Sequence, residues 1–252
     1  MRAALITGAT SGIGKAFAHA LPHSIALVLT GRDPDALSRL QRSLGGRRTI
    51  ETVQADLTTD AGLDAVCAVA ERMDIDLLVC NAGVGPYGDF LATEETALRE
   101  TVALNVAAPL VLMRRLLPGM IGRAERDNAR AGVIVVSSSL AFMPVPRLAI
   151  YAASKSFLLS LTEAVGAELV NRPVDVLALC PTATRSRFAE RSGFGRMPPG
   201  AQSPDYVARR ALWALGRQST LVLGPLSGSM LSGPALVRAV AARTLHTLLP
   251  RR

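Results

Sequence analysis

Three residue types near the middle of the chain could together move a proton. A serine cluster, Ser137–Ser139, follows the apolar run 133–136, and Tyr151 and Lys155 come shortly after it. Tyrosine and lysine at i and i+4 lie on one face of a helix. A strand that ends in serine beside that face would gather a hydroxyl, a phenol and an ammonium. Such a group could protonate or deprotonate a carbonyl or alcohol oxygen.

The use of lysine supports this interpretation of the stretch. Among 28 basic residues, Lys15 and Lys155 are the only lysines, and the others are arginines. Positive charge alone is therefore supplied by arginine, and Lys155 is expected to serve as an amine. Taken by itself, the stretch could also be a helix start that carries a surface lysine.

A glycine-rich turn near the N-terminus predicts a phosphate site. The apolar run Ala3–Thr7 predicts a buried strand, and 15–21 predicts a helix. A helix N-terminus approached through glycines exposes backbone amides to an anion. The spacing Gly-x-x-x-Gly-x-Gly differs from the common dinucleotide and triphosphate motifs, and a tight connection is the alternative. The residues predicted to hold the pyrophosphate are Gly8, Thr10, Ser11, Gly12, Ile13 and Gly14.

The second predicted strand, 25–29, ends near a residue that could read a ribose phosphate. Thr30 and Gly31 carry no acid, and Arg32 follows them. An acid there would favour the ribose hydroxyl of NAD, whereas an arginine invites the 2′-phosphate of NADP. NADP(H) is therefore favoured, with NAD(H) as the alternative. Asp33 could pair with Arg32 or cap the next helix.

Two further strand ends carry residues expected near the cofactor. Asp56 and Leu57 follow the predicted strand 50–54, where Asp56 could accept a hydrogen bond from adenine or cap a helix. The small residues Asn81, Ala82 and Gly83 follow the predicted strand 77–79 and would let the nicotinamide ribose approach the backbone.

A predicted helix over 96–113 places Asn105 among apolar neighbours. A buried asparagine needs partners, so it is expected to satisfy a backbone group or to hold a water beside the lysine. The charged stretch 122–132 is expected to be a surface loop.

Strands and helices alternate along the whole chain, which predicts an α/β fold. The predicted elements continue with a helix over 151–170, a strand over 174–180, a helix over 203–215 and a strand over 220–223. This order indicates a doubly wound parallel sheet with helices on both faces. We expect one domain over 1–252, with a substrate lid at 187–204 and a variable tail at 234–252.

Composition excludes several function classes. Apolar residues make up 49% of the chain and its net charge is +8, which is typical of a globular protein. Aromatic residues are only 4% and no basic block reaches five residues, so a nucleic-acid partner is not expected. No stretch is apolar enough to predict a signal peptide or a membrane span.

The cysteines and histidines do not suggest a metal site. Cys67, Cys80 and Cys180 are isolated, which favours a reducing, cytoplasmic compartment. His19 and His23 share a helical face but lack an obvious third ligand, so no metal is predicted.

Taken in order, these motifs resemble those of the short-chain dehydrogenase/reductase family. Residues 7–14 look like its glycine motif, and Asn81-Ala82-Gly83 looks like its Asn-Ala-Gly motif. The similarity covers about residues 1–190. It implies a Rossmann-type sheet of about seven strands, a nicotinamide cofactor, and a homodimer or homotetramer.

The resemblance also assigns residue roles. Asn105, Ser138, Tyr151 and Lys155 fall at the positions of the family's catalytic tetrad, and the family's spacing to Tyr151 selects Ser138 over Ser137 and Ser139. Tyr151 would be the general acid or base, Ser138 would bind the substrate oxygen, and Lys155 would hold the ribose. Pro181, Thr184 and Ser186 would lie at the nicotinamide, with Thr184 and Ser186 bonding its carboxamide. Thr182 replaces the family's usual glycine, and Cys80 replaces a frequent asparagine.

The tyrosine must ionise more easily than free tyrosine to act as a base. A phenol has a pKa near 10, and lowering it by about three units needs roughly 4 kcal/mol. Lys155, the oxidised nicotinamide and poor solvent access are expected to lower the pKa of Tyr151 together.

The substrate is expected to be a small molecule, a carbonyl compound or a secondary alcohol. Apolar residues favour a bulky apolar ketone; they are Leu140, Phe142, Met143, Leu148, Phe188, Phe194 and Met197. Arg187, Arg191 and Arg196 could instead bind a carboxylate or an acyl-carrier phosphate, or could be solvated. The alternatives are a non-catalytic NADP-binding regulatory protein and a membrane-surface lipid or acyl ketoreductase. The tail could pack on the core or a second subunit, or touch a membrane surface.

Overall fold

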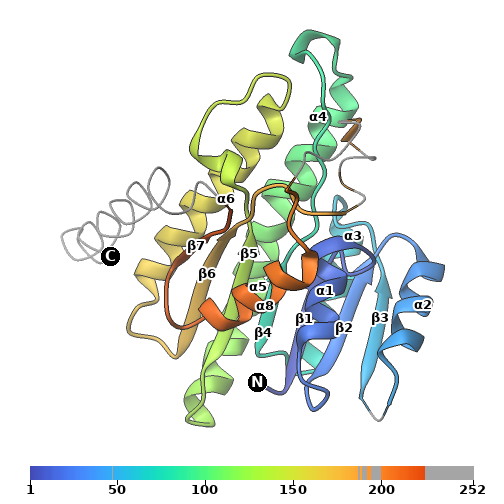
Figure 1. The fold of residues 1–252 in the computed structure, drawn as a ribbon. Coiled ribbons are helices and arrows are strands. Elements are labelled where there is room, and N and C mark those ends of the chain that lie inside the picture. Colours follow the sequence, from blue (N-terminus) through green and yellow to red (C-terminus); the bar gives the residue numbers. More distant parts are fainter. Residues whose placement is uncertain (47, 187, 189–191, 194–199, 225–252) are drawn as a thin grey trace.

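The computed structural model describes residues 1–46, 48–186, 188, 192–193 and 200–224 (Figure 1). The predicted tail 234–252 lies outside these residues, as do Phe194, Met197 and the three arginines predicted in the lid. Seven parallel strands form one sheet in the order β3-β2-β1-β4-β5-β6-β7. The strands are β1 Ala3–Thr7, β2 Ala26–Gly31, β3 Ile50–Gln54, β4 Leu77–Cys80, β5 Ala131–Val136, β6 Val174–Cys180 and β7 Thr220–Val222.

Helices cover both faces of this sheet. They are α1 Gly12–Ala20, α2 Pro34–Leu44, α3 Asp60–Arg72, α4 Glu95–Val102, α5 Ala108–Arg126, α6 Ala149–Glu168 and α8 Pro204–Ala214. Short helical turns η1 Phe90–Ala92 and η3 Ser139–Phe142, with the π-helical η2 Ala103–Ala107, complete the set.

The core has one layer on each face of the sheet. Leu5 and Val28 pack with residues of α3, α5 and α6. Ile6, Leu27 and Leu29 pack on the opposite face with residues of α1, α2 and α8. Alternate residues of one strand thus reach opposite layers, as the period of a strand requires. The predicted doubly wound Rossmann-type fold is confirmed.

Helix starts follow the capping pattern in the sequence. The Asp33 carboxylate accepts a hydrogen bond from the Ala36 N–H at 2.9 Å, so Asp33 caps α2. Thr59 caps α3 through the Gly62 N–H at 3.1 Å. Short polar side chains satisfy backbone donors that a helix start leaves unpaired.

The long central helix differs from its prediction. It is interrupted by η2 and then continues as α5 to Arg126, so the first half of the predicted loop 122–132 is wrong. Its charges misled the prediction, because Ile121 and Ala124 are buried while Glu125 and Arg126 are exposed. Arg123 turns inward and donates to the Ile75 carbonyl oxygen. By length and composition, 95–126 could cross a membrane, but 56% of its apolar window is buried in the protein.

Candidate active site

The predicted site residues meet at one edge of the sheet. Because all strands are parallel, the segments after β1, β4, β5 and β6 leave from the same edge. The sheet order reverses between β1 and β4, which are neighbours at its centre. Crevices at such switch points are where doubly wound folds bind ligands.

The turn after β1 forms a cradle that side chains would fill. Gly8 and Gly12 have φ of +63° and +53°, a region that favours glycine. A Cβ on Gly14 would lie 2.4 Å from the Gly8 carbonyl oxygen. The turn leads into α1, whose first amides can face an anion. These residues fit the pyrophosphate of a dinucleotide.

Asn81 and Thr7 fasten this turn to the end of β4. The Asn81 amide donates to the carbonyl oxygens of Thr7 at 2.8 Å and Gly8 at 3.2 Å. The Thr7 hydroxyl accepts from the N–H groups of Asn81 at 2.9 Å and Ala82 at 3.0 Å. Sequence reasoning did not assign a role to Thr7, although a threonine before the first glycine was a visible signal.

Arg32, the residue predicted to bind the 2′-phosphate, forms an ion pair that the sequence did not predict. Arg32 Nη1 lies 2.8 Å from Glu100 Oε1 of α4, and the Arg32 side chain is 55% exposed. The Asp56 carboxylate accepts from the N–H and hydroxyl of Thr58, which lowers the pKa of Asp56. Leu57 is buried beside it. Arg32 therefore lies where it was predicted, but Glu100 offsets its charge.

Tyr151 and Lys155 lie one turn apart on α6, as their spacing predicts. The Lys155 ammonium is 5.7 Å from the centre of the Tyr151 ring and donates to the Val136 carbonyl oxygen at 2.8 Å. The Ser138 side chain interacts with the Tyr151 phenol and favours its ionised form. Ser137 instead donates to the Lys155 carbonyl oxygen at 2.7 Å and so fastens α6 to the end of β5.

Burial changes how this group ionises. Desolvation raises the pKa of Tyr151 to about 12, although the interaction with Ser138 opposes the change. Burial likewise lowers the pKa of Lys155 to about 8. The expectation that poor solvent access would help to lower the phenol pKa is wrong, because desolvation penalises the charged phenolate. Tyr151 is a neutral phenol at neutral pH, ready to give a proton.

Asn105 is fully buried and its amide is engaged by the chain. It donates to the Val84 carbonyl oxygen at 2.7 Å and to the Ser154 hydroxyl at 3.0 Å, and it accepts from the Val84 N–H at 2.9 Å. A Cβ on Gly83 would lie 3.2 Å from the Asn105 oxygen and 3.4 Å from the Lys155 nitrogen. Asn105 thus satisfies a backbone segment next to Lys155, the first of its two expected roles.

The loops after β6 and β4 close around the site. Thr184 is buried and donates to the Thr182 carbonyl oxygen at 3.0 Å, and a Cβ on Gly12 would meet Ser186 at 2.8 Å. The backbone carbonyl of Pro181 accepts from the Ser139 N–H at 2.9 Å, which joins this loop to η3. Ser186 therefore lies against the glycine turn that was predicted to share a ligand with it, while Thr184 is held within the loop after β6.

Apolar side chains gather beside Tyr151. The Phe188 ring centre is 5.0 Å from that of Tyr151, and a Cβ on Gly85 would lie 2.5 Å from the tyrosine ring. A separate hollow of about 500 Å³ is bordered by Phe142, Met143 and the start of α6. Ser138 and Tyr151 are not among the described residues that line this hollow, so it neighbours the reacting group and does not contain it.

Comparison with known proteins establishes the family. The model of the family described as short chain dehydrogenase matches residues 2–193. The chain belongs to the short-chain dehydrogenase/reductase family. It is 33% identical over 204 residues to human dehydrogenase/reductase SDR family member 2, mitochondrial, with 75% of this chain and 67% of that protein covered. It is 30% identical over 222 residues to the mouse inactive hydroxysteroid dehydrogenase-like protein 1, with 85% and 66% covered.

Solved structures of the family share the fold. A short-chain dehydrogenase from Sphingobium yanoikuyae with NADPH has a TM-score of 0.81 at 28% identity, covering 100% of this chain and 97% of its own. A 3-ketoacyl-(acyl-carrier-protein) reductase from Brucella melitensis with NADH gives 0.78 at 27%, covering 88% and 96%. A bulky-bulky ketone specific alcohol dehydrogenase from Comamonas testosteroni gives 0.76 at 26%, covering 100% and 96%. The fold is thus found with both nicotinamide cofactors.

Proposed function

We propose that the protein is an NADP(H)-dependent oxidoreductase that interconverts a carbonyl compound and a secondary alcohol. The observation that carries the proposal is the half-buried, neutral Tyr151 phenol, which interacts with Ser138 and lies one helical turn from Lys155. The cofactor supplies or accepts the hydride when bound. A substrate carbonyl oxygen beside Ser138 and Tyr151 takes its proton from the phenol.

Three other residues bind the substrate oxygen, stabilise the phenolate and position the lysine. Ser138 holds the substrate oxygen and steadies the charge that develops on it. Lys155 stabilises the phenolate that remains and binds the ribose hydroxyls, while Asn105 fixes the backbone of Val84 beside the lysine. Because burial raises the pKa of Tyr151, the cofactor-free site favours proton donation. Alcohol oxidation needs the phenolate, so we expect its kcat to rise with pH more steeply than that of ketone reduction.

Arg32 supports NADP(H) over NAD(H). Its half-exposed guanidinium lies just past the end of β2, next to the tight contact between Gly31 and Thr10. A guanidinium binds a 2′-phosphate through paired hydrogen bonds. Glu100 would weaken that preference, so we expect NADP(H) to be preferred while NAD(H) still binds.

The substrate class rests on the apolar residues near Tyr151. Phe188 packs on the tyrosine ring, and Phe142 and Met143 border the adjoining hollow. These residues favour a bulky apolar ketone, in agreement with the bulky-ketone specificity named for the Comamonas testosteroni relative. The acyl substrate named for the Brucella melitensis relative supports the second candidate, a lipid or acyl ketoreductase.

A screen of NADPH consumption tests the proposal. The purified chain is given small, aryl and steroid-sized ketones and 3-oxoacyl thioesters, and each alcohol product is identified by mass spectrometry. We expect turnover with bulky ketones, and faster turnover with NADPH than with NADH. Tight NADPH binding without any turnover would instead favour the non-catalytic regulatory protein, a role consistent with the relative named as inactive.

The cellular setting is part of the proposal. Cys67, Cys80 and Cys180 are buried and free, which suits a reducing cytoplasm. Exposed apolar side chains on three helices, Val102, Leu110 and Phe157, support self-association into the expected homodimer or homotetramer. Light scattering on a size-exclusion column measures that state.

A further inference from the structure

The outer side of α8 carries aromatic and basic side chains at helical spacing. The surface here called the α8 face consists of Tyr206, Arg209, Arg210 and Trp213 of the helix, with Arg217 from the turn that follows it. Tyr206 and Trp213 are 48% and 54% exposed, high values for large aromatic side chains. The opposite side of the helix is buried in the core through Val207, Ala208, Ala211 and Ala214. Because the opposite side of the helix is buried in the core, the α8 face points toward solvent.

The side chains of this face are already organised around the tryptophan. The guanidinium carbons of Arg210 and Arg217 lie 5.1 Å and 5.2 Å from the centre of the Trp213 ring. Both separations are within the range of cation–π attraction. Arg217 also donates to the Trp213 carbonyl oxygen. The exposed Trp213 ring is thus accompanied by the guanidinium groups of Arg210 and Arg217.

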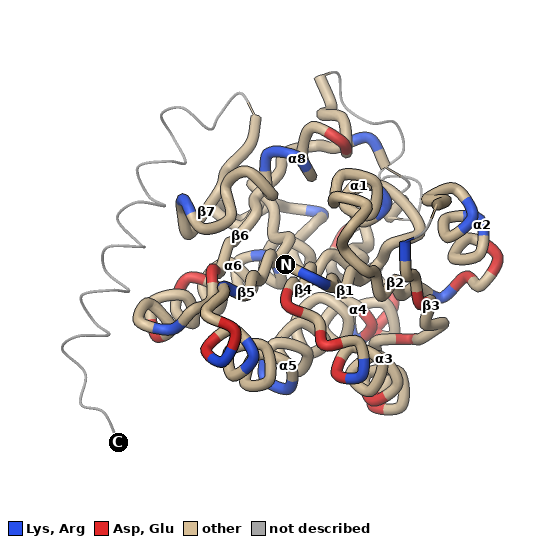
Figure 2. The backbone as a smooth tube through the Cα atoms, turned by 90° about the horizontal axis from the view of Figure 1, so that it is seen from below, with Lys and Arg blue, Asp and Glu red and all other residues tan. Residues whose placement is uncertain are grey.

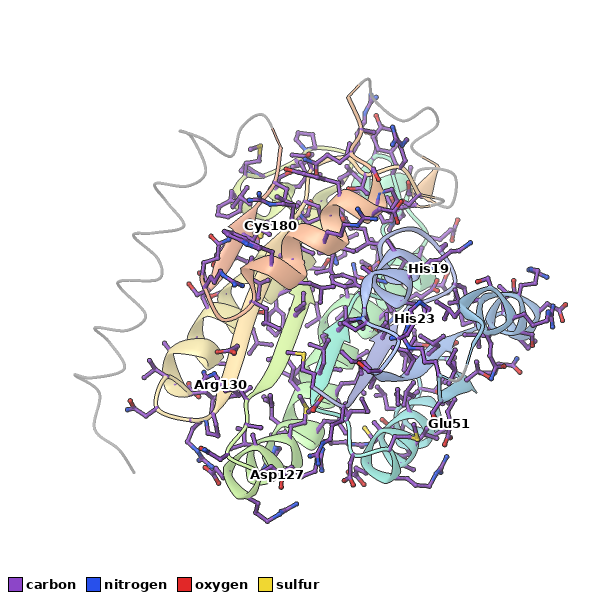
Figure 3. The ribbon with its side chains drawn as sticks, turned by 60° about the horizontal axis from the view of Figure 1, so that its bottom comes forward. His19, His23, Glu51, Asp127, Arg130 and Cys180 are labelled. Carbon is purple, nitrogen blue, oxygen red and sulfur yellow. The ribbon has the colours of Figure 1, made fainter. Side chains whose placement is uncertain are left out.

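The surroundings add positive charge. α8 packs beside α1 (Figure 2), whose sequence includes Lys15. The neighbouring His19 of α1 (Figure 3) adds no charge at neutral pH, because burial lowers its pKa. The sequence of α8 contains one acidic residue, Asp205. Three of the five side chains of the α8 face are arginines, so the face carries a net positive charge and complements an anionic partner.

We propose that the α8 face binds an anionic phospholipid surface. Tryptophan and tyrosine prefer the interface between lipid and water, and flanking arginines attract anionic headgroups. A second copy of the chain is disfavoured, because a two-fold contact between two α8 faces would bring two positively charged surfaces together. A nucleic acid is disfavoured because base stacking needs an open ring, and Trp213 already carries two guanidinium groups. The inference does not depend on the proposed catalytic function.

The chain offers a direct probe of this contact. Trp213 is the only tryptophan in the 252 residues, so its fluorescence reports on the α8 face alone. The full chain is titrated with vesicles of phosphatidylcholine, with and without phosphatidylglycerol. We expect a blue shift and protection from acrylamide quenching with the anionic vesicles, and neither with phosphatidylcholine alone. Failure of the tryptophan signal to change while the protein still sediments with vesicles would overturn the proposal.

Charge variants distinguish an effect of the α8 face on vesicle binding from an effect of the protein's net charge. The double variant Arg209→Gln with Arg210→Gln should lower vesicle binding, measured by co-sedimentation, by roughly 30-fold at low salt. The matched control is Arg42→Gln with Arg114→Gln, which removes the same charge from exposed positions on α2 and α5. Circular dichroism confirms that both variants are folded. Equal losses in both would overturn the proposal.

The rival partners are tested with the same signal. A concentration-dependent shift of Trp213 emission without lipid would indicate a second copy of the chain and contradict the proposal. A response to duplex DNA that exceeds the response to anionic vesicles would also contradict it.

Discussion

At the residue scale, the contact between Arg32 and Glu100 controls the charge offered to the cofactor. Arg32 follows β2 and Glu100 lies in α4, so the two residues are far apart in the chain, and their nearest charged atoms are 2.8 Å apart. Both side chains are about half exposed, so the ion pair itself contributes little to stability. Its consequence lies in binding, because a 2′-phosphate and Glu100 compete for one guanidinium.

Glu100→Gln is therefore expected to strengthen NADPH binding. Removal of the competing carboxylate should lower the Kd for NADPH by roughly two- to fivefold, as expected for a half-exposed pair, with less change for NADH. Fluorescence titration with both cofactors measures this. Glu95→Gln, which breaks the exposed pair with Arg99 on the same helix, is the control and should leave both Kd values unchanged.

Arg32→Ala tests the same contact from the other side. Loss of the guanidinium should weaken NADPH binding much more than NADH binding, because only NADPH carries the 2′-phosphate. Equal losses for both cofactors would show that Arg32 does not read the phosphate.

At the element scale, a π-helical turn and a glycine loop position the tyrosine and lysine. The turn η2 carries Asn105 between α4 and α5, and the amide of Asn105 holds Val84 in the loop after β4. Such π-helical turns are common at functional sites. The same loop presents Gly85 to the face of Tyr151.

Asn105→Ala should destabilise the protein, because it leaves the backbone polar groups of Val84 unpaired. The expected loss is about 1–3 kcal/mol in the free energy of unfolding, measured by urea denaturation. Thr96→Ala, at an exposed position of α4, is the control and should change stability little. An Asn105 variant as stable as the control would contradict the role described for this amide.

Gly85→Ala should impair turnover without preventing folding. The added methyl would lie 2.5 Å from a ring carbon of Tyr151 and push the phenol out of place. A displacement on the order of 1 Å costs roughly a hundredfold in kcat. Gly88→Ala is the control in the same loop, because its nearest neighbour, the Thr93 hydroxyl, would be 3.8 Å away. A Gly85 variant with the activity of the control would refute this steric argument.

At the scale of the whole molecule, the buried site lowers stability at neutral pH. The pKa of Lys155 falls from 10.5 to about 8 on folding, so the unfolded chain binds this proton more tightly. The resulting cost is present below pH 8 and disappears as the pH rises from about 8 to 10.5. Tyr151 acts in the opposite sense. Its pKa rises from 10.0 to about 12, so its contribution is present below pH 10 and is lost above it.

Lys155→Met should therefore make the cofactor-free protein more stable at pH 7. The gain is on the order of 2 kcal/mol, after the lost hydrogen bond to Val136 is set against the relieved desolvation. Urea denaturation at pH 7 and pH 10 measures it, and the gain should shrink at the higher pH. A variant less stable than the native chain at pH 7 would contradict the pKa direction given for Lys155.

Much of this fold was predictable because its signals are local. The alternation of apolar runs with amphipathic stretches predicted the order of strands and helices, and Asp33 predicted a helix start. The extension of α5 into the charged stretch was missed, because the charged residues there suggested a loop and the inward bond of Arg123 to Ile75 joins distant parts of the chain. The π-helical turn was missed because no residue pattern marks it.

The sequence predicted which residues form the site, but not their ion pairs or their pKa values. Tyr151 and Lys155 were identified from type and spacing, Ser138 was selected through the family resemblance, and the structure brings the three together. The Arg32–Glu100 contact joins two distant elements and has no local signal. The pKa of Tyr151 depends on how deeply the folded chain buries it, which spacing cannot reveal.

Replacement of Tyr151 by phenylalanine tests the central claim most directly. The variant keeps the ring that packs against Phe188 and loses only the hydroxyl. With a bulky ketone from the screen, kcat should fall by at least roughly a hundredfold, while the Kd for NADPH stays close to that of the native chain. Substantial remaining turnover with unchanged NADPH binding would show that Tyr151 does not supply the proton.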